Sequence, residues 1–158
     1  MKIYAGIGSR ETPKGVLLAM STEAQRRAKE GWLLRSGGAN GADEAFAAGA
    51  MAASGAIEIY RPYHANDTSD KLAIQVIEEL NKVQNTNLVF KKMKPYTQQL
   101  ISRNMQIVLG EKLDTPVNEI LCWTKNGDLT GGTRYAIMLG RMLNIPITNY
   151  GHTQLKNI

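Results

Sequence analysis

The chain has 158 residues, of which 43% are hydrophobic and 21% charged, which is enough for one domain with a hydrophobic core over residues 1–158. No apolar run approaches the ~18 residues of a membrane span, and the first six residues lack the apolar region of a signal peptide. We therefore expect a cytoplasmic protein with no membrane partner. The formal net charge of +5 favours phosphate-bearing partners without distinguishing a nucleotide from a nucleic acid.

Two strand, loop and helix units open the chain. Residues 2–7 have the pattern of a strand and residues 8–13 that of a loop, and apolar residues then recur at helical spacing until Gly31 ends the helix. The second unit has a short apolar strand over residues 31–34, a glycine-rich turn, and an alanine-rich helix from about residue 43 to residue 54. Each glycine-rich loop is thus predicted to follow the carboxyl end of a strand.

The rest of the chain continues this alternation. We expect a strand over residues 56–60, then a helix through Leu80 that Thr68 or Ser69 caps, and a brief apolar run at residues 88–90. A tail from Asn149 is expected to dock loosely. Between residue 90 and this tail we expect a helix over residues 96–110, a strand over 119–123, a polar loop over 124–132, a helix over 133–143 and a last short strand over 145–148. The proline of this last strand suggests either an edge strand or the start of a strand.

Strands that alternate with helices predict the fold class. It is α/β, with a single Rossmann-like three-layer domain in which helices cover both faces of a mostly parallel sheet. In such sheets ligands bind beyond the carboxyl ends of the strands, near the point where the strand order reverses. The three glycine-containing loops are therefore expected to converge on one pocket at that edge.

Metal and disulfide chemistry are not predicted. Cys122 is the one cysteine and lies in an apolar run, which indicates a buried, inert thiol. His64 and His152 have no cysteine or carboxylate partners at metal-ligand spacing, and we interpret both as surface or structural residues. Two basic clusters are most simply solvated surface, and the role of the second is open: Arg26, Arg27 and Lys29, and Lys91, Lys92 and Lys94.

The stretch from Arg35 to Glu44 has the composition of a phosphate-binding turn between a strand and a helix. Glycine removes the Cβ that keeps a ligand from the backbone, and a helix that starts after the turn offers unpaired N–H donors. Arg10 and Arg103 could neutralise a phosphate. Hydroxyl groups that could donate to it belong to Ser9, Ser36, Thr130 and Thr133.

Other signals limit the chemistry. The chain has neither a strand-linked Gly-x-Gly-x-x-Gly fingerprint nor a Gly-x-x-x-x-Gly-Lys-Ser/Thr loop, so we predict neither NAD nor ATP hydrolysis, and no cofactor. Asp43 and Glu44 either stabilise the start of a helix or act on a ligand, by hydrogen bonds to ribose hydroxyls or by acid/base chemistry. Of the aromatic residues that could stack on a base, Trp123 and Tyr135 are more simply core, and Tyr63 stays a candidate.

Four segments resemble, in the same order, the motifs of the Rossmann core of the DNA-processing protein A family (DprA, also called Smf). They are residues 8–10, residues 36–43, residues 102–104 and the run from Gly127 through Ala136. The resemblance implies binding of single-stranded DNA and a homodimer. The wider superfamily includes the LOG-type nucleoside-monophosphate phosphoribohydrolases, whose catalytic glutamate is replaced by Ala136 here. The phosphate-binding residues that the resemblance implies are Gly8, Ser9, Arg10, Ser36, Gly37, Gly38, Ala39 and Arg103. The glycine-containing loop before the last helix adds Gly131, Gly132 and Thr133 to the expected phosphate-binding residues.

Three functions remain open at this point. The first is binding of the phosphate of a nucleotide or of single-stranded DNA. The second is nucleoside-monophosphate N-glycosidase activity, which would have to use Asp43, Glu44 or Asp128. The third is capture of a signalling nucleotide.

Overall fold

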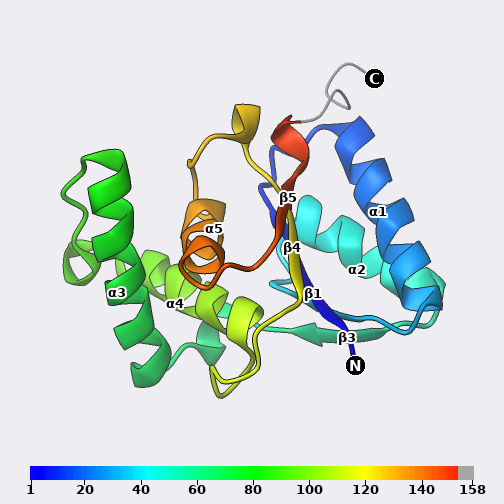
Figure 1. The fold of residues 1–158 in the computed structure, drawn as a ribbon, viewed down its shortest axis with the longest axis horizontal. Coiled ribbons are helices and arrows are strands. Elements are labelled where there is room, and N and C mark those ends of the chain that lie inside the picture. The colour runs from blue at the N-terminus through cyan, green and yellow to red at the C-terminus, as the bar shows by residue number, and fades with distance from the viewer. Residues whose placement is uncertain (153–158) are drawn as a thin grey trace.

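The computed structural model describes residues 1–152 and contains one sheet of five parallel strands (Figure 1). The strand order is β3-β2-β1-β4-β5, so the chain winds outward from β1 in both directions. This confirms the predicted α/β class with a parallel sheet. The strands are β1 (Ile3–Gly8), β2 (Leu33–Ser36), β3 (Ala56–Ile59), β4 (Glu119–Trp123) and β5 (Ile147–Asn149).

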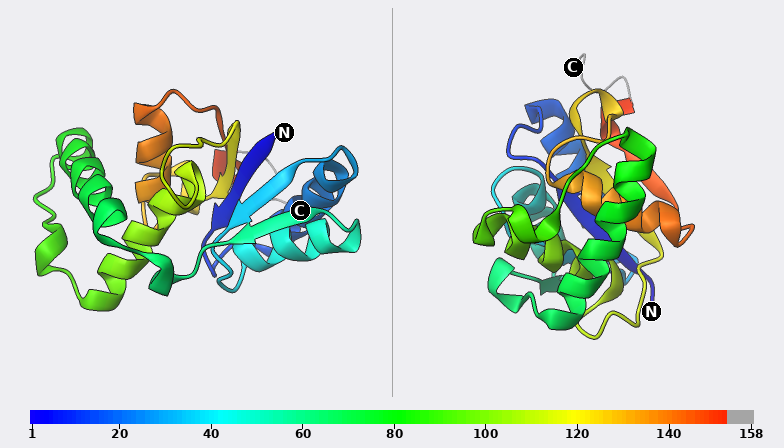
Figure 2. Two further views of the ribbon diagram at one scale, coloured as in Figure 1. Left: turned by 90° about the horizontal axis from the view of Figure 1, so that it is seen from below. Right: turned by 90° about the vertical axis from the view of Figure 1, so that its left-hand side faces the viewer.

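Helices cover both faces of the sheet, as predicted. One face is covered by α1 and α2 and the other by α4 and α5, while α3 packs on α4 and α5 farther from the sheet (Figures 1 and 2). No helix among residues 1–152 is long and apolar enough to cross a membrane. The helices are α1 (Lys14–Lys29), α2 (Ala42–Ala52), α3 (Asp67–Gln84), α4 (Pro95–Leu109) and α5 (Thr133–Met142).

The core has two parts, one on each face of the sheet. Successive strand residues point to opposite faces, so Ala5 and Ile120 join the cluster under α4 and α5, and Tyr4 and Leu121 join the cluster under α1 and α2. Cys122 is fully buried in the first cluster, and burial raises the pKa of its thiol to about 12. The predicted burial of this thiol is confirmed.

Several predicted boundaries are wrong, and most shifts are small. Asn66 caps α3 in place of Thr68 or Ser69, because its Oδ1 accepts from the Ser69 N–H at 3.0 Å and the Ser69 hydroxyl accepts from the Asn66 N–H at 2.9 Å. β2 begins two residues later than expected and includes Arg35 and Ser36. The apolar run at residues 88–90 forms no strand and leads into a short 3₁₀ helix, η2 (Phe90–Lys92).

The segment after β5 is fixed to the loop after β4. The Asn149 Oδ1 accepts from the backbone N–H of Thr124 at 3.2 Å and of Gly151 at 2.9 Å, and its amide group donates to the Thr124 hydroxyl at 2.7 Å. The expected loose docking is therefore wrong for residues 149–152, and the rest of that tail lies outside the described residues. β5 is an edge strand, as its proline suggested, but it starts at Ile147.

Candidate functional site

A cavity of about 800 Å³ opens beyond the carboxyl ends of β1 and β4. These two strands are neighbours in the sheet, but from β1 the chain continues toward β2 and from β4 toward β5. Their boundary is therefore the topological switch point, where parallel α/β sheets bind ligands. The predicted convergence of loops is found here, since the loops after β1, β2 and β4 all contribute walls.

The loop after β1 forms the first wall with Gly8, Ser9 and Arg10. The Ser9 carbonyl accepts from the Thr12 hydroxyl at 2.6 Å and from the Ala42 N–H at 3.4 Å, so it joins this loop to the start of α2. The Ser9 hydroxyl accepts from the Glu11 N–H at 2.9 Å. Arg10 is exposed at the cavity, which leaves its guanidinium available to a ligand.

The turn after β2 forms the second wall, and two of its residues must be glycine. Gly41 has φ +87°, and a Cβ there would lie 2.6 Å from the Ser9 carbonyl oxygen. Gly38 has φ +70°, and its carbonyl accepts from Arg61 at 2.9 Å. L-residues rarely adopt such φ values, so the glycines let the two loops pack closely.

The start of α5 forms the third wall with Gly131, Gly132 and Thr133. No side chain caps this helix and no acidic residue lies in its first turn. Its first N–H groups have no intrahelical acceptors, and the positive end of the helix dipole lies there. Lys125 adds a positive side chain to the lining and Asp128 a negative one, so the preference of this wall depends on the start of the helix. This wall favours an anion.

Asp43 lies between the first two walls with only 4% of its surface exposed. Its Oδ2 accepts from the Ala39 N–H at 3.2 Å, whereas its Oδ1 has no hydrogen-bond partner among the described residues. Burial raises the pKa of Asp43 to about 6, although the N–H of Ala39, the charge of Arg103 and the N–H groups of Gly8 and Gly37 oppose the shift. The site thus holds a carboxylate with one free acceptor atom.

Arg103, on α4, is hydrogen-bonded to the backbone of the turn that forms the second wall. Its Nη1 donates to the carbonyls of Gly37 and Tyr60, both at 2.8 Å, and its Nε donates to the Asn104 side chain at 3.0 Å. Burial lowers the pKa of Arg103, and the charge of Asp43 opposes this. The Arg103 side chain also lines the cavity.

The structure brings most of the predicted site residues together. Those that line the cavity are Gly8, Ser9, Arg10, Gly38, Ala39, Asp43, Arg103, Asp128, Thr130, Gly131, Gly132 and Thr133.

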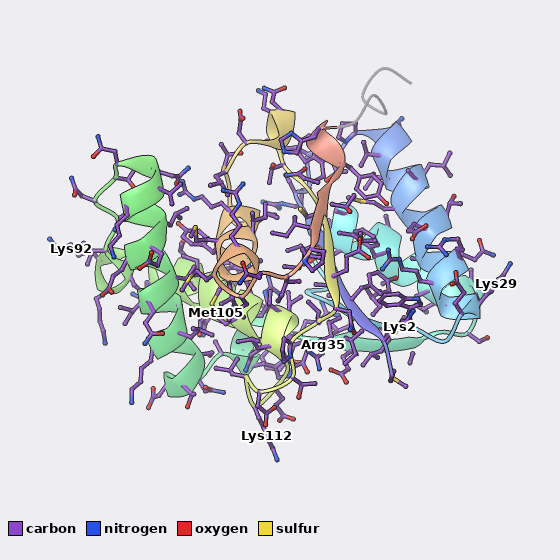
Figure 3. The ribbon with its side chains drawn as sticks, viewed as in Figure 1. Lys2, Lys29, Arg35, Lys92, Met105 and Lys112 are labelled. Atoms are coloured by element: carbon purple, nitrogen blue, oxygen red, sulfur yellow. The ribbon has the colours of Figure 1, made fainter. Side chains whose placement is uncertain are left out.

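Three predicted residues do not line it. The Ser36 hydroxyl donates to the Gly6 carbonyl at 2.6 Å inside the sheet, Gly37 is buried behind the wall, and Glu44 is exposed on α2. Arg35 also lies elsewhere: Figure 3 shows it in the interior, where it pairs with Glu58 at 3.1 Å.

Apart from Arg103, sequence reasoning missed the contribution of α4. Tyr96 and Leu100 line the cavity, and Tyr96 is 62% exposed at its rim. The sequence pattern could have indicated this contribution, because Tyr96, Leu100 and Arg103 are spaced by four and three residues and so lie on one face of the helix. Asn40, Asn104 and Asn126 also line it without having been predicted as ligand residues.

The other aromatic and basic candidates lie in different places. Trp123 lines the cavity, whereas Tyr135 is buried and not part of the lining. Tyr63 is 75% exposed outside the cavity, with its ring 4.4 Å from that of His64. The three lysines at positions 91, 92 and 94 are exposed and do not line it, and Figure 3 shows Lys92 at the outer edge of the molecule. Among residues 1–152 no group of three or more metal-ligating side chains is found.

Comparison of the chain with protein-family models, with curated proteins and with solved structures gave no match.

Proposed function

We propose that this protein binds the phosphate of a nucleotide or of single-stranded DNA in the cavity at the carboxyl edge of the sheet. The observation that carries the proposal is the convergence of three loops, two of them glycine-rich helix starts, on one cavity at the switch point. The volume of about 800 Å³ is within the range of small-molecule sites. Arg10 and Lys125 lie on different walls and supply positive charge.

The start of α5 is a better phosphate site than the start of α2. Asp43 and Glu44 are in the first turn of α2, and Asp43 already accepts from the Ala39 N–H that a phosphate would use. A second anion close to Asp43 would be repelled. The first turn of α5 contains no acid and α5 begins in the cavity lining, so an anion would gain both hydrogen bonds and the helix dipole there.

An apolar rim suits the base of a nucleotide. Tyr96 and Leu100 line the α4 side of the cavity, and the exposed ring of Tyr96 is free to stack. Stacking on an aromatic side chain is worth ~1–3 kcal/mol per base. The ligand would then lie with its phosphate at α5 and its base toward α4.

A pair of variants at Gly132 tests the phosphate position. Gly132 has φ −69° and ψ −27°, and a Cβ there meets nothing within 4 Å, so side chains are accommodated. Gly132→Asp puts a negative charge at the start of α5, and Gly132→Asn is its neutral control. We expect calorimetric titration with nucleoside monophosphates to show at least a tenfold weaker Kd for Gly132→Asp than for Gly132→Asn. Equal affinities would contradict the phosphate position.

Salt dependence separates the two ligand classes. Binding of single-stranded DNA through several phosphates weakens with salt with a slope of about −0.7 per phosphate neutralised. A mononucleotide makes fewer such contacts, so its slope is shallower. Parallel titrations with a mononucleotide and a single-stranded oligonucleotide at several salt concentrations measure both slopes, and the absence of binding to either would reject the proposal.

Asp43 favours one second candidate, a nucleotide N-glycosidase. A buried carboxyl with a pKa of about 6 can exchange a proton near neutral pH. Ala136 is fully buried and does not line the cavity, whereas Asp43 does. We expect release of free base from a nucleoside monophosphate, measured by chromatography, to fall in Asp43→Asn and to persist in Glu44→Gln. No release from a folded protein that binds the nucleotide would reject this activity and leave binding intact.

A further inference from the structure

We propose that Asp43 accepts a hydrogen bond from a sugar hydroxyl of the ligand, so that the cavity selects a free ribonucleotide over an internal unit of a DNA strand. The inference rests on the proposed phosphate site and adds the chemical class of its ligand. It starts from one atom, the Oδ1 of Asp43, which is buried, has no partner, and belongs to a side chain that lines the cavity.

An unpartnered buried carboxylate oxygen requires a donor. An ionised carboxylate only accepts hydrogen bonds, and leaving one buried acceptor unsatisfied is costly. The Ala39 N–H goes to Oδ2, and the Arg103 Nη1 goes to two backbone carbonyls. The N–H groups of Gly8 and Gly37 also lie near the carboxylate, but neither forms a hydrogen bond with Oδ1. A ligand group that completes this site must therefore carry an O–H or N–H, which excludes an ionised phosphate.

The position of Asp43 indicates which part of a nucleotide supplies the donor. The phosphate is assigned to the start of α5 and the base to the exposed rim at Tyr96, whereas Asp43 is deep between the loops after β1 and β2. The sugar lies between phosphate and base in any nucleotide, and its hydroxyls are donors. Inside a DNA strand the sugar has no 2′-hydroxyl and its 3′-oxygen is esterified, so no donor is left for Asp43.

The hydrogen bonds of Asp43 also indicate which substitution tests the role of Oδ1. Oδ2 must stay an acceptor because the Ala39 N–H points at it. In Asp43→Asn the amide oxygen takes that place, and the amide N–H₂ then occupies the position of Oδ1. The substitution keeps the shape of the side chain and replaces an acceptor by a donor. Glu44→Gln, one residue along and outside the cavity lining, is the matched control for loss of a negative charge.

The experiment compares the four ribonucleoside 5′-monophosphates with their 2′,3′-dideoxy counterparts by calorimetric titration. Hydrogen bonds to charged groups predict that the ribonucleotides bind about 10- to 100-fold more tightly than the dideoxynucleotides to the unmodified protein. In Asp43→Asn the difference should shrink, because the amide N–H₂ in the place of Oδ1 can give the hydroxyl oxygen only a neutral hydrogen bond, while Glu44→Gln should keep the full difference.

Each contrary result has its own meaning. Equal binding of both series to the unmodified protein would overturn the role of Asp43 and leave the phosphate site standing. A difference of undiminished size in Asp43→Asn would assign the hydroxyl to another residue and also overturn it. If neither series binds the folded protein, the phosphate site itself fails. The first comparison needs no variant, so it decides the question even if Asp43→Asn does not fold.

Discussion

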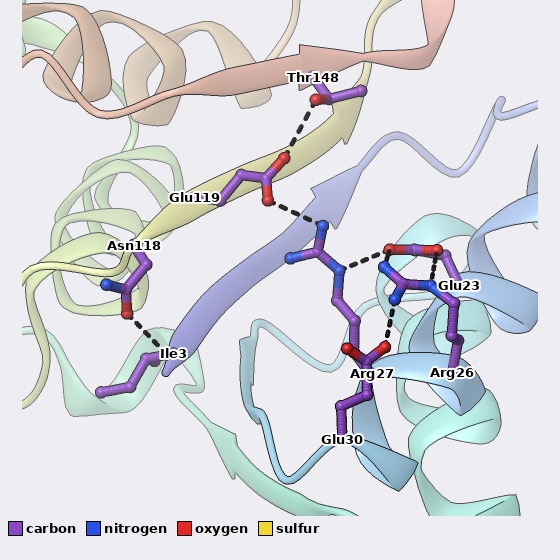
Figure 4. Close-up of polar contacts among 8 residues, drawn as sticks. All are labelled: Ile3, Glu23, Arg26, Arg27, Glu30, Asn118, Glu119 and Thr148. Atoms are coloured by element: carbon purple, nitrogen blue, oxygen red, sulfur yellow. Dashed lines mark hydrogen bonds and ion pairs between the residues drawn. The ribbon is translucent and has the colours of Figure 1, made fainter. Parts of the chain in front are cut away.

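Two groups of charged residues lie at opposite edges of the sheet. The charged side chains of one group pair with each other, whereas those of the other group bond mainly to the backbone. At the amino edge, Arg27 pairs with Glu23 at 2.6 Å and with Glu119 at 2.8 Å (Figure 4). Its guanidinium also lies over the rings of Trp32 and Tyr4, at 4.5 and 5.0 Å. At the carboxyl edge, Asp43 and Arg103 lie close together but bond mainly to the backbone of the loops around them.

The pKa values of the two groups move in opposite directions. Burial alone would lower the pKa of Arg27, but its hydrogen bonds to Glu23 and Glu119 outweigh burial and raise it. Hydrogen bonds from Arg26 and Arg27 lower the pKa of Glu23. Burial instead raises the pKa of Asp43 and lowers that of Arg103. The amino-edge group stabilises its charges, whereas the carboxyl-edge group has charges that a ligand could stabilise further, which is typical of functional sites.

Replacing Arg27 should have the largest effect. Arg27→Met leaves Glu23 and Glu119 partly buried without their cation, and breaking a buried pair in this way costs about 3–5 kcal/mol of the free energy of unfolding. Urea denaturation measures this loss. Arg26→Met is the control, because Arg26 is exposed at the same helix end, and its removal should change stability little. If both variants were equally stable, the amino-edge group would not support the fold.

The stability of the protein should also depend on the protonation of Asp43. Its pKa is raised from an ordinary 3.8 to about 6, so between these values the folded state binds more protons than the unfolded state. The free energy of unfolding therefore falls as the pH rises through this window, by about 3 kcal/mol in total, and stays level above it. Asp43→Asn has no such proton to lose.

The measurement is the difference in unfolding free energy between the unmodified protein and Asp43→Asn across that pH window. We expect the unmodified protein to lose about 3 kcal/mol relative to the variant between about pH 3.5 and about pH 7. A difference that does not change with pH would mean that Asp43 titrates normally. The fold would then not disfavour the ionised form of Asp43, and the contrast with the amino-edge group would be lost.

Much of the frame of the site could be predicted from the sequence because it depends on local signals. Alternating strand and helix patterns predicted a parallel sheet, and the parallel sheet placed the loops after β1, β2 and β4 at one edge. The glycines at positions 38 and 41 were recognisable because each allows a sharp turn that other residues resist.

The contacts inside the site could not be predicted in the same way, because they join distant parts of the chain. Ser36 had the composition of a phosphate ligand but donates to Gly6 in the neighbouring strand. Arg103 reaches Gly37 across 66 positions, and Arg27 reaches Glu119 across 92. The partner of such a side chain depends on how helices pack on the sheet, which no local pattern specifies.

The smallest predicted effect concerns the stability of α5. A helix start without an acidic residue forgoes the interaction of a negative charge with the dipole, worth ~0.3–1 kcal/mol. Because Gly132 already has helical φ and ψ, Asp at this position would act through its charge. Gly132→Asp should therefore be more stable than Gly132→Asn by that amount in urea denaturation, while binding nucleotide more weakly. A variant that gains stability as it loses binding cannot have lost binding by unfolding. That combination would identify the start of α5 as a part of the carboxyl edge that is left open for an anion, in contrast to the amino edge, where Arg27 is already paired with Glu23 and Glu119.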